Sequence, residues 1–262
     1  MISTLRLALF KIPLLVLLSL NLVNVRHTYA ENKVTFRRVL NARQVLTFID
    51  EQRSQTKESG VTLLDARDLY PKYYWSHAVG AQHTPWRSFT IGRKSGVLKD
   101  LKSLQNQMES LGIHPQKPVI IYGDWEKGWG EEARMLWLLE YLGHTQVYVV
   151  EGGWAALTLQ GMSSEWGRTQ VVKRSVWSLT PDLSRRADTQ TVEGLLARGV
   201  LSFDARSKRE FDGETPYGST YGGHFPNSIH VPWKNLLTVD HKLKTILELR
   251  EYFFSLGAHM DQ

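Results

Sequence analysis

The chain has 262 residues, of which 42% are hydrophobic and 22% charged, a composition that excludes a disordered or collagen-like protein. It contains no cysteine, which excludes a disulfide framework, a thiolate zinc site, an iron–sulfur cluster and a cysteine nucleophile within these residues. The formal net charge is +6, but the charges are interspersed without a basic block, so nucleic acid is not an expected partner.

The N-terminal 30 residues have the pattern of an export signal. Arg6 and Lys11 precede an apolar run over 12–23, and small residues lead up to a cleavage site at Ala30. The run is short for a membrane span, so we expect cleavage after Ala30 and no stable span afterwards, with a retained anchor as the alternative. The sequence therefore predicts export, to the bacterial periplasm or out of the cell.

Apolar runs and helical patterns alternate in the first half of the chain. In chain order the expected elements are a strand over 61–66, a helix over 99–112, a strand over 119–123, a helix over 131–143 and a strand over 146–153. The run over 119–123 is continuously apolar, as in a strand buried on both faces of a sheet. This alternation predicts an α/β fold with a mostly parallel central sheet flanked by helices.

Three motifs of the first half return in the same order in the second half. The matching pairs are 64–67 with 203–206, 76–86 with 223–233, and 111–114 with 256–259. Such a series indicates a duplication. Since the counterpart of the strand at 119–123 would begin past Gln262, we expect the second copy to lack its last two strands. The chain is then either a fragment or a protein in which the first copy shelters the second.

These motifs, together with Gly-Gly-Trp at 152–154, resemble the tandem rhodanese-like sulfurtransferases of the thiosulfate and 3-mercaptopyruvate type. The resemblance implies two rhodanese-like domains with mostly parallel central sheets flanked by helices, the second incomplete at its C-terminal end. The implied segments are a signal peptide over 1–30, a first domain of the inactive type over 35–160, a linker over 161–187, and a second domain over 188–262 that stops before its active-site loop.

The resemblance also implies a reaction. Members of the family transfer sulfane sulfur from thiosulfate or 3-mercaptopyruvate type donors to thiol or cyanide acceptors, through a cysteine persulfide in the C-terminal copy. The corresponding position would lie near residue 268, past Gln262, so no catalytic residue, cofactor or metal is expected here. We expect an inactive chain or a fragment whose longer form would bind a small anionic sulfur donor. The alternative is an exported, non-catalytic rhodanese-like module that binds a protein partner.

The resemblance places a degenerate loop of the first copy where the cysteine would stand. Its residues are Gly123, Asp124, Trp125, Glu126, Lys127 and Gly128. Acidic side chains, including Glu131 and Glu132, outnumber basic ones around this loop and would repel an anionic donor, so a structural role is predicted. The indoles of Trp125 and Trp129 are expected to be exposed as a contact surface.

Four residues of the second copy are candidates for a substrate-side or a structural role: Asp204, Arg206, Arg209 and Glu210. The resemblance implies that Glu210 stands where thiosulfate-type members often have a substrate-binding arginine. Asp65 and Asp204, each two residues before an arginine, are expected to form structural hydrogen bonds or ion pairs. The histidine pairs share a six-residue spacing because the segment is duplicated, and no metal site is expected.

Overall fold

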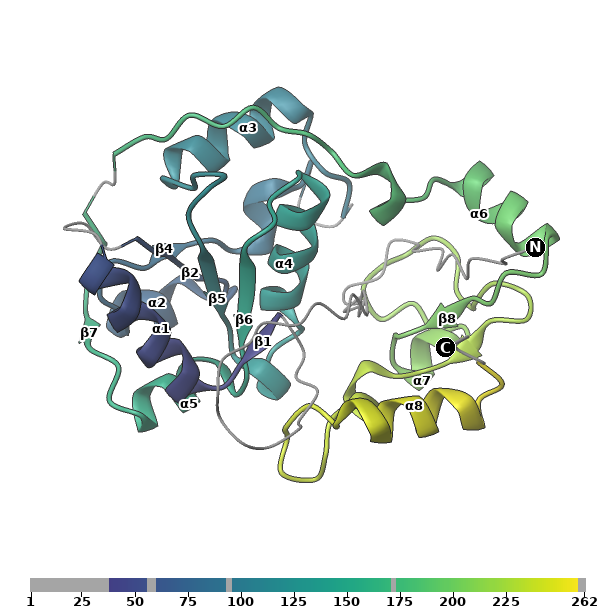
Figure 1. Ribbon diagram of the computed structural model, residues 1–262. Helices are drawn as coiled ribbons and strands as arrows, with labels where there is room; N and C mark the ends of the chain where they lie inside the picture. The colour runs from purple at the N-terminus through teal and green to yellow at the C-terminus, as the bar shows by residue number, and fades with distance from the viewer. Residues whose placement is uncertain (1–37, 56–59, 93–95, 171–172, 259–262) are drawn as a thin grey trace.

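The computed structural model describes residues 38–55, 60–92, 96–170 and 173–258; the expected export signal and His259 of the third repeated motif lie outside them. The centre of the first unit is a parallel sheet of five strands in the order β1–β6–β5–β2–β4 (Figure 1). Its strands are β1 (Val39–Leu40), β2 (Thr62–Asp65), β4 (Gln82–His83), β5 (Val119–Tyr122) and β6 (Val147–Val150). The prediction of an α/β fold with a parallel central sheet flanked by helices is confirmed.

Helices cover both faces of this sheet because successive residues of its strands point to opposite sides. In β5, Val119 and Ile121 pack in a core with α3 (Leu101–Ser110) and α4 (Glu131–Tyr141). Ile120 and Tyr122 pack on the other side with α1 (Ala42–Gln55) and α5 (Gly153–Leu159). All four residues of β5 are buried, as the continuous apolar run predicts. The short helices α2 (Tyr70–Trp75), η1 (Trp86–Phe89) and η2 (Trp125–Lys127) complete the unit.

The expected linker over 161–187 is packed against the first unit along much of its length. Its strand β7 (Ser164–Glu165) pairs antiparallel with β3 (His77–Ala78). Farther along, Trp177 is buried in the core on the α3–α4 side of the sheet. The turn η3 (Leu183–Arg185) is bonded to α4, since the indole of Trp137 donates to the Arg185 carbonyl at 2.8 Å. The polar composition of the segment did not predict these contacts with the first unit.

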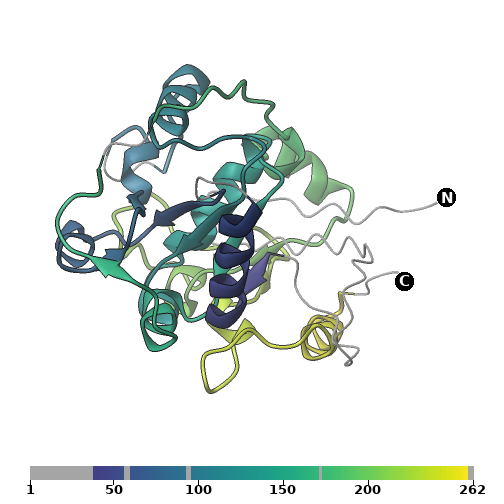
Figure 2. The ribbon, with the colours of Figure 1, turned by 60° about the vertical axis from the view of Figure 1, so that its left-hand side comes forward.

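A second, smaller unit follows (Figures 1 and 2). Its elements are α6 (Thr189–Ala197), β8 (Phe203–Asp204), α7 (Lys208–Phe211), β9 (Ile229–His230), η4 (Trp233–Leu236) and α8 (Ile246–Ser255). Strands β8 and β9 are parallel, and among the described residues the buried apolar cluster around them consists of Phe203, Val231 and Ala258. Helix α8 begins at Ile246 because the side chain of Thr245 caps it, accepting from the Glu248 amide.

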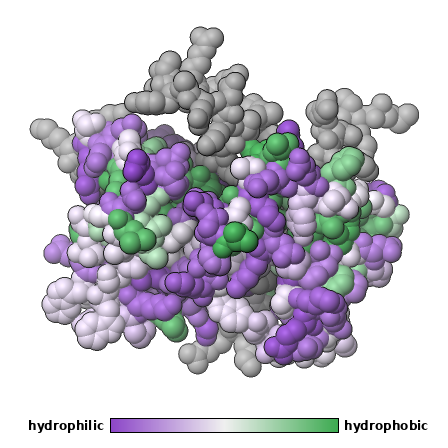
Figure 3. Space-filling view, turned by 90° about the horizontal axis from the view of Figure 1, so that it is seen from below, coloured by the Kyte–Doolittle hydropathy of each residue, from purple (hydrophilic) through white to green (hydrophobic). Residues whose placement is uncertain are grey.

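Large apolar side chains that are exposed include Trp75, Leu159 and Trp166. On the face in Figure 3, green residues are interspersed with purple ones. Among the described residues, no helix is both long enough and apolar enough to span a membrane.

Candidate functional site

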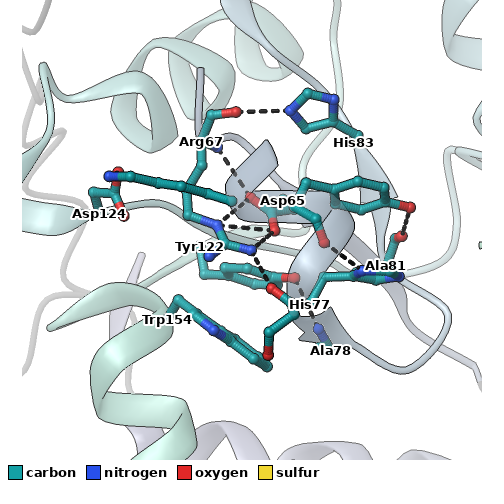
Figure 4. A network of polar contacts seen from close by, with 12 residues as sticks. Asp65, Arg67, His77, Ala78, Ala81, His83, Tyr122, Asp124 and Trp154 are labelled. Carbon is teal, nitrogen blue, oxygen red and sulfur yellow. Dashed lines mark hydrogen bonds and ion pairs between the residues drawn. The ribbon is translucent and has the colours of Figure 1, made fainter. Parts of the chain in front are cut away.

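An arginine–aspartate pair occupies the carboxyl end of β2, close to the loop over 123–130 (Figure 4). Arg67 donates to both carboxylate oxygens of Asp65, at 2.9 and 3.0 Å from Nε and 2.5 Å from Nη2, and its backbone amide donates at 3.0 Å. The same Nη2 donates to the Ser76 carbonyl at 2.6 Å. The guanidinium also lies over the rings of Tyr122 and Trp154, at 5.9 and 5.5 Å.

The guanidinium of Arg67 has a structural role in these contacts. Burial acts to lower the pKa of Arg67, but the hydrogen bonds and charge of Asp65 outweigh it and raise the pKa on balance. Both side chains are buried, so Arg67 holds the loop after β2 and offers little surface to a substrate. Burial strongly raises the pKa of the Tyr122 hydroxyl, to which the Ala78 amide donates at 3.0 Å.

The second unit repeats the hydrogen bonds of this pair. Arg206 donates to Asp204 from Nε at 3.0 and 3.1 Å and from Nη2 at 2.5 Å, and to the Gly223 carbonyl at 2.6 Å. The registers also agree, since Asp65 is opposite His83 and Asp204 is opposite His230. The Arg206 side chain is 23% exposed against 5% for its counterpart in the first unit, because the second unit covers it less.

The repeated histidines pack against aromatic rings. Tyr73 stacks with His77 and His83 at ring distances of 4.0 and 4.8 Å. Phe211 stacks in the same way with His224 and His230, at 3.6 and 4.5 Å. Within the described ranges, no three His, Cys, Asp or Glu side chains form a cluster that could hold a metal ion.

The other two candidates of the second unit serve local structure. Glu210 closes a capping box at the start of α7, where its Oε2 accepts from the Ser207 hydroxyl at 2.7 Å. Arg209 is exposed and forms an ion pair with Glu214 at 2.5 Å. Arg206 donates to Asp204 and to the Gly223 carbonyl, and the charge of Glu210 adds to the hydrogen bonds and charge of Asp204 in raising the pKa of Arg206.

The loop after β5 holds the six candidates of the first unit and contacts several elements. The Gly123 carbonyl accepts from the Trp154 amide at 3.0 Å, at the start of α5. Asp124 forms an ion pair at 2.5 Å with Lys72 of α2. Backbone bonds from Lys127 to the Asp124 carbonyl and from Gly128 to the Trp125 carbonyl form the η2 turn, which also includes Glu126.

The prediction that Trp125 is exposed is wrong. The residue is 8% exposed, has a φ of 52°, and its indole Nε1 donates at 2.5 Å to the carbonyl of His241 in the second unit. Trp129 is 59% exposed, as predicted, and its ring contacts that of Tyr217 at 5.1 Å. The sequence could not show that a hairpin over 237–243, whose His241 lies 116 residues after Trp125, covers one tryptophan and leaves the other accessible.

Two glutamates at the start of α4 lie beneath this loop. Both are buried, whereas in the sequence they are recognised only as acidic side chains around the loop. Burial raises the pKa of Glu132 to about 8, and the neighbouring charges of Glu131, Asp124 and Glu126 add to the effect. Burial also raises the pKa of Glu131, against hydrogen bonds from backbone amides that lower it.

A mainly apolar pocket lies between the two units beside this loop. The first unit contributes Val39, Trp125, Glu132, Ala133, Leu136 and Val149, and the second contributes Trp233, Leu236, Leu237 and Leu243. Of these lining residues, Glu132 is the one with an ionisable side chain. The amide of Leu243 also donates to Glu151 at 2.9 Å, so the contact between the units combines apolar packing with hydrogen bonds.

Comparisons with known proteins agree with the resemblance seen in the sequence. The family model described as "Rhodanese-like domain" matches residues 48–160. The chain is 28% identical over 239 residues to the sulfur carrier protein TtuD of Thermus thermophilus, with 84% of this chain and 80% of that protein covered. It is 31% identical over 183 residues to the putative thiosulfate sulfurtransferase SseB of Mycobacterium tuberculosis, with 68% and 64% covered.

Solved structures with similar folds include SseA from Escherichia coli, whose structure is described as that of a 3-mercaptopyruvate sulfotransferase. It has a TM-score of 0.67 and 21% sequence identity, with 82% of this chain and 84% of that chain covered. The Tum1 protein of Saccharomyces cerevisiae has a TM-score of 0.67 and 15% identity, with 86% and 81% covered. At these identities the likeness concerns the fold.

Proposed function

We propose that this chain, a member of the rhodanese-like sulfurtransferase family, carries no sulfur-transfer centre within its 262 residues. We also propose that the loop over 123–130 holds the second unit in place. One observation carries this proposal. The loop begins with Gly123, and the buried carboxyl of Glu132 fills the space where a side chain at that position would stand.

The chemistry of sulfur transfer supports an inactive loop. A persulfide forms when a thiolate attacks a sulfur donor, so the carrier must be a cysteine. The sequence has none, and the loop presents only carboxylates, Lys127 and indoles in its place. Sulfur transfer by a longer form would need a thiol outside these residues and an anionic donor bound to that longer form.

The contacts of the loop support the docking role. The bond from Trp125 to the His241 carbonyl joins the loop to the hairpin of the second unit, and the pocket beside it is lined from both units. The core of the second unit is small, and small cores are marginally stable alone. The packing of the half-buried Leu237 against the core of the first unit therefore stabilises the second.

An activity assay tests the proposal. The purified chain is incubated with thiosulfate and cyanide, and separately with 3-mercaptopyruvate and a thiol, while a cysteine-containing sulfurtransferase serves as the positive control. We expect thiocyanate and sulfide release no faster than in buffer, because no thiol is present. Turnover that scales with the concentration of the chain would refute the proposal.

An exposed aromatic cluster favours a second candidate, an exported module that binds a protein partner. Trp75 and Trp166 are 74% and 75% exposed, and their rings contact Tyr74 at 6.1 and 6.4 Å. Tryptophan and tyrosine are enriched at interaction hot spots. The test is to crosslink the purified chain to proteins of a native extract. We expect the double variant Trp75→Ala/Trp166→Ala to lose a specific partner that the control variant Trp129→Ala retains. Equal capture of that partner by both variants would contradict this candidate.

Export is part of the same proposal. It is supported by the charged start, the apolar run over 12–23 and the small residues before Glu31. The intact mass of the protein from its native source is expected to correspond to a start at Glu31. A start at Met1 in the mature protein would favour the retained anchor instead.

A further inference from the structure

Strand β7 lies at the outer margin of the first unit (Figure 2). It forms a two-stranded sheet with β3, in which Glu165 is opposite His77. Among the described residues no strand pairs with its other side, so β7 presents an open edge there. Ser164 and Trp166 are exposed at this edge. An open edge is a template for pairing with a further strand.

The backbone at this edge has unused hydrogen-bonding groups. The Val79 amide donates to the Ser163 carbonyl at 3.1 Å, so that carbonyl faces β3. Across a trans peptide bond the next amide points the opposite way, and successive residues of an antiparallel strand alternate in direction. The amide and carbonyl of Ser164 and the amide of Trp166 therefore point outward. Within the described ranges, none of these three groups has a hydrogen-bond partner.

Aromatic rings of α2 lie beside the edge. Tyr70 and Tyr74 are about one helical turn apart, and their rings contact each other at 5.9 Å. Tyr74 also contacts the exposed rings of Trp75 and Trp166, at 6.1 and 6.4 Å. Since Trp166 follows β7 directly, rings from the helix and from the strand segment form one surface, on which apolar side chains of a partner can pack.

A cation borders these rings. The exposed Arg168 donates from Nε to the Tyr70 hydroxyl at 3.0 Å, and its charge also interacts with Tyr74. No carboxylate of the described residues pairs with this guanidinium. Glu165 is used on the inner side, where its Oε1 accepts from the Gly80 amide at 2.8 Å. The surface therefore favours a partner that brings a carboxylate, because guanidinium–carboxylate pairs are strong and directional.

We propose that the outer edge of β7 accepts an extended segment of a partner protein that carries apolar side chains and an acidic residue. The backbone of the segment pairs with Ser164 and with the Trp166 amide, its apolar side chains pack on Trp75 and Trp166, and its carboxylate pairs with Arg168. The inference rests on the second candidate function, the module that binds a protein partner, and gives the chemistry of that partner.

Peptides selected on the full chain from a phage-displayed library of short random sequences provide the probe. We expect the enriched peptides to combine acidic and apolar residues and to contain few prolines, because proline cannot donate to a strand edge. Enrichment of basic peptides, or none above a blank surface, would overturn the proposal.

Two variants separate the backbone from the charge when the most enriched peptide is titrated by fluorescence anisotropy. Ser164→Pro removes the outward amide hydrogen and leaves the pairing with β3, and Ser164→Ala is its matched control. Arg168→Glu reverses the charge. We expect Ser164→Pro and Arg168→Glu each to weaken binding at least about tenfold, and Ser164→Ala and Trp129→Ala to resemble the wild type. Wild-type affinity of either Ser164→Pro or Arg168→Glu would overturn the proposal.

Hydrogen exchange provides a readout of strand addition. The bound peptide should slow the exchange of the Ser164 and Trp166 amides, and unchanged exchange would overturn the proposal. If Ser164→Pro does not fold, the same peptide with alternate backbone amides N-methylated replaces it. It should bind the wild type at least about tenfold more weakly, and equal binding would count against strand pairing.

Two further outcomes separate this inference from its rivals. Binding of the wild type to phosphatidylglycerol vesicles that Trp75→Ala/Trp166→Ala loses and Ser164→Pro keeps would show that the rings attach to a lipid surface, which overturns the proposal. A crosslinked partner that Trp75→Ala/Trp166→Ala loses, but that Ser164→Pro and Arg168→Glu both keep, would refute this inference and leave the second candidate function standing.

Discussion

Replacement of Gly123 by alanine probes the contact between the loop and α4 directly. The added methyl group would overlap Glu132 Oε2, and the Glu132 Cβ atom lies 3.4 Å away on the same side. A carboxylate end can usually rotate away from such a clash, but Glu132 is buried, so the carboxyl would have to move into the packed region around Trp125. We expect the folded state to be destabilised.

The magnitude follows from overpacking. Extra methylene groups in a packed interior cost about 1–3 kcal/mol, while loss of glycine freedom in the unfolded chain returns about 0.4–1 kcal/mol where the backbone tolerates alanine. The φ of Gly123 lies outside the left-handed region, so the clash dominates, and the net loss should be about 1–2 kcal/mol. For a chain of this size that lowers the melting temperature by about 2–8 °C.

Urea unfolding of a double-mutant cycle provides the assay. The cycle joins Gly123→Ala with Glu132→Ala, which removes the carboxyl, and we expect a favourable coupling of at least about 1 kcal/mol. Gly153→Ala is the control, because its Cβ atom would overlap the Gly123 carbonyl oxygen and its φ is +57°, so Glu132→Ala should not rescue it. Wild-type stability of Gly123→Ala, or a coupling near zero, would refute the reasoning.

Three other predictions concern stability. Burial raises the pKa of Glu132 from its ordinary 4.5 to about 8, so its contribution to stability is full below about pH 4.5 and is lost as the pH rises through 8. Glu132→Gln should flatten that part of the profile of unfolding free energy against pH in urea titrations, and an unchanged profile would contradict the assignment. Trp125→Phe should lower the free energy of unfolding by about 0.5–1.5 kcal/mol, because the indole hydrogen bond to His241 is lost. It should also increase hydrogen exchange of the backbone amides around His241. Unchanged exchange would show that this bond does not hold the units together. Asp65→Asn breaks a buried ion pair and should lower the free energy of unfolding by about 3–5 kcal/mol in denaturant titrations. Asp204→Asn should lower it clearly less, because its partner Arg206 is partly exposed. Equal losses for the two variants would be inconsistent with this difference in burial.

Periodicity and apolar runs predicted three strands of the first unit's sheet, β2, β5 and β6, but not the two-residue strands β1 and β4. The run at Val119–Tyr122 is buried on both faces because helices cover both sides of β5, and such coverage is a local consequence of strand–helix alternation. The arginine–aspartate pairs at 65–67 and 204–206 involve neighbours in sequence, so their pairing could also be expected from the motif.

Contacts between distant segments could not be predicted in this way. The burial of Trp125 depends on His241, and that of Trp177 depends on the core beside α3 and α4. Glu132 appears in the sequence as a surface charge at a helix start, where acidic residues are common. Its carboxyl lies against Gly123 of the loop, in a pocket that the second unit helps to line, and no local pattern in the sequence indicates either contact.

The central claim is that the chain cannot itself carry sulfane sulfur. Intact mass spectrometry of the purified protein, before and after incubation with excess thiosulfate or 3-mercaptopyruvate, tests this most directly. The account predicts one unchanged mass, because the loop at Gly123 holds a filled space instead of a thiol. A gain of one sulfur atom that cyanide removes would contradict it.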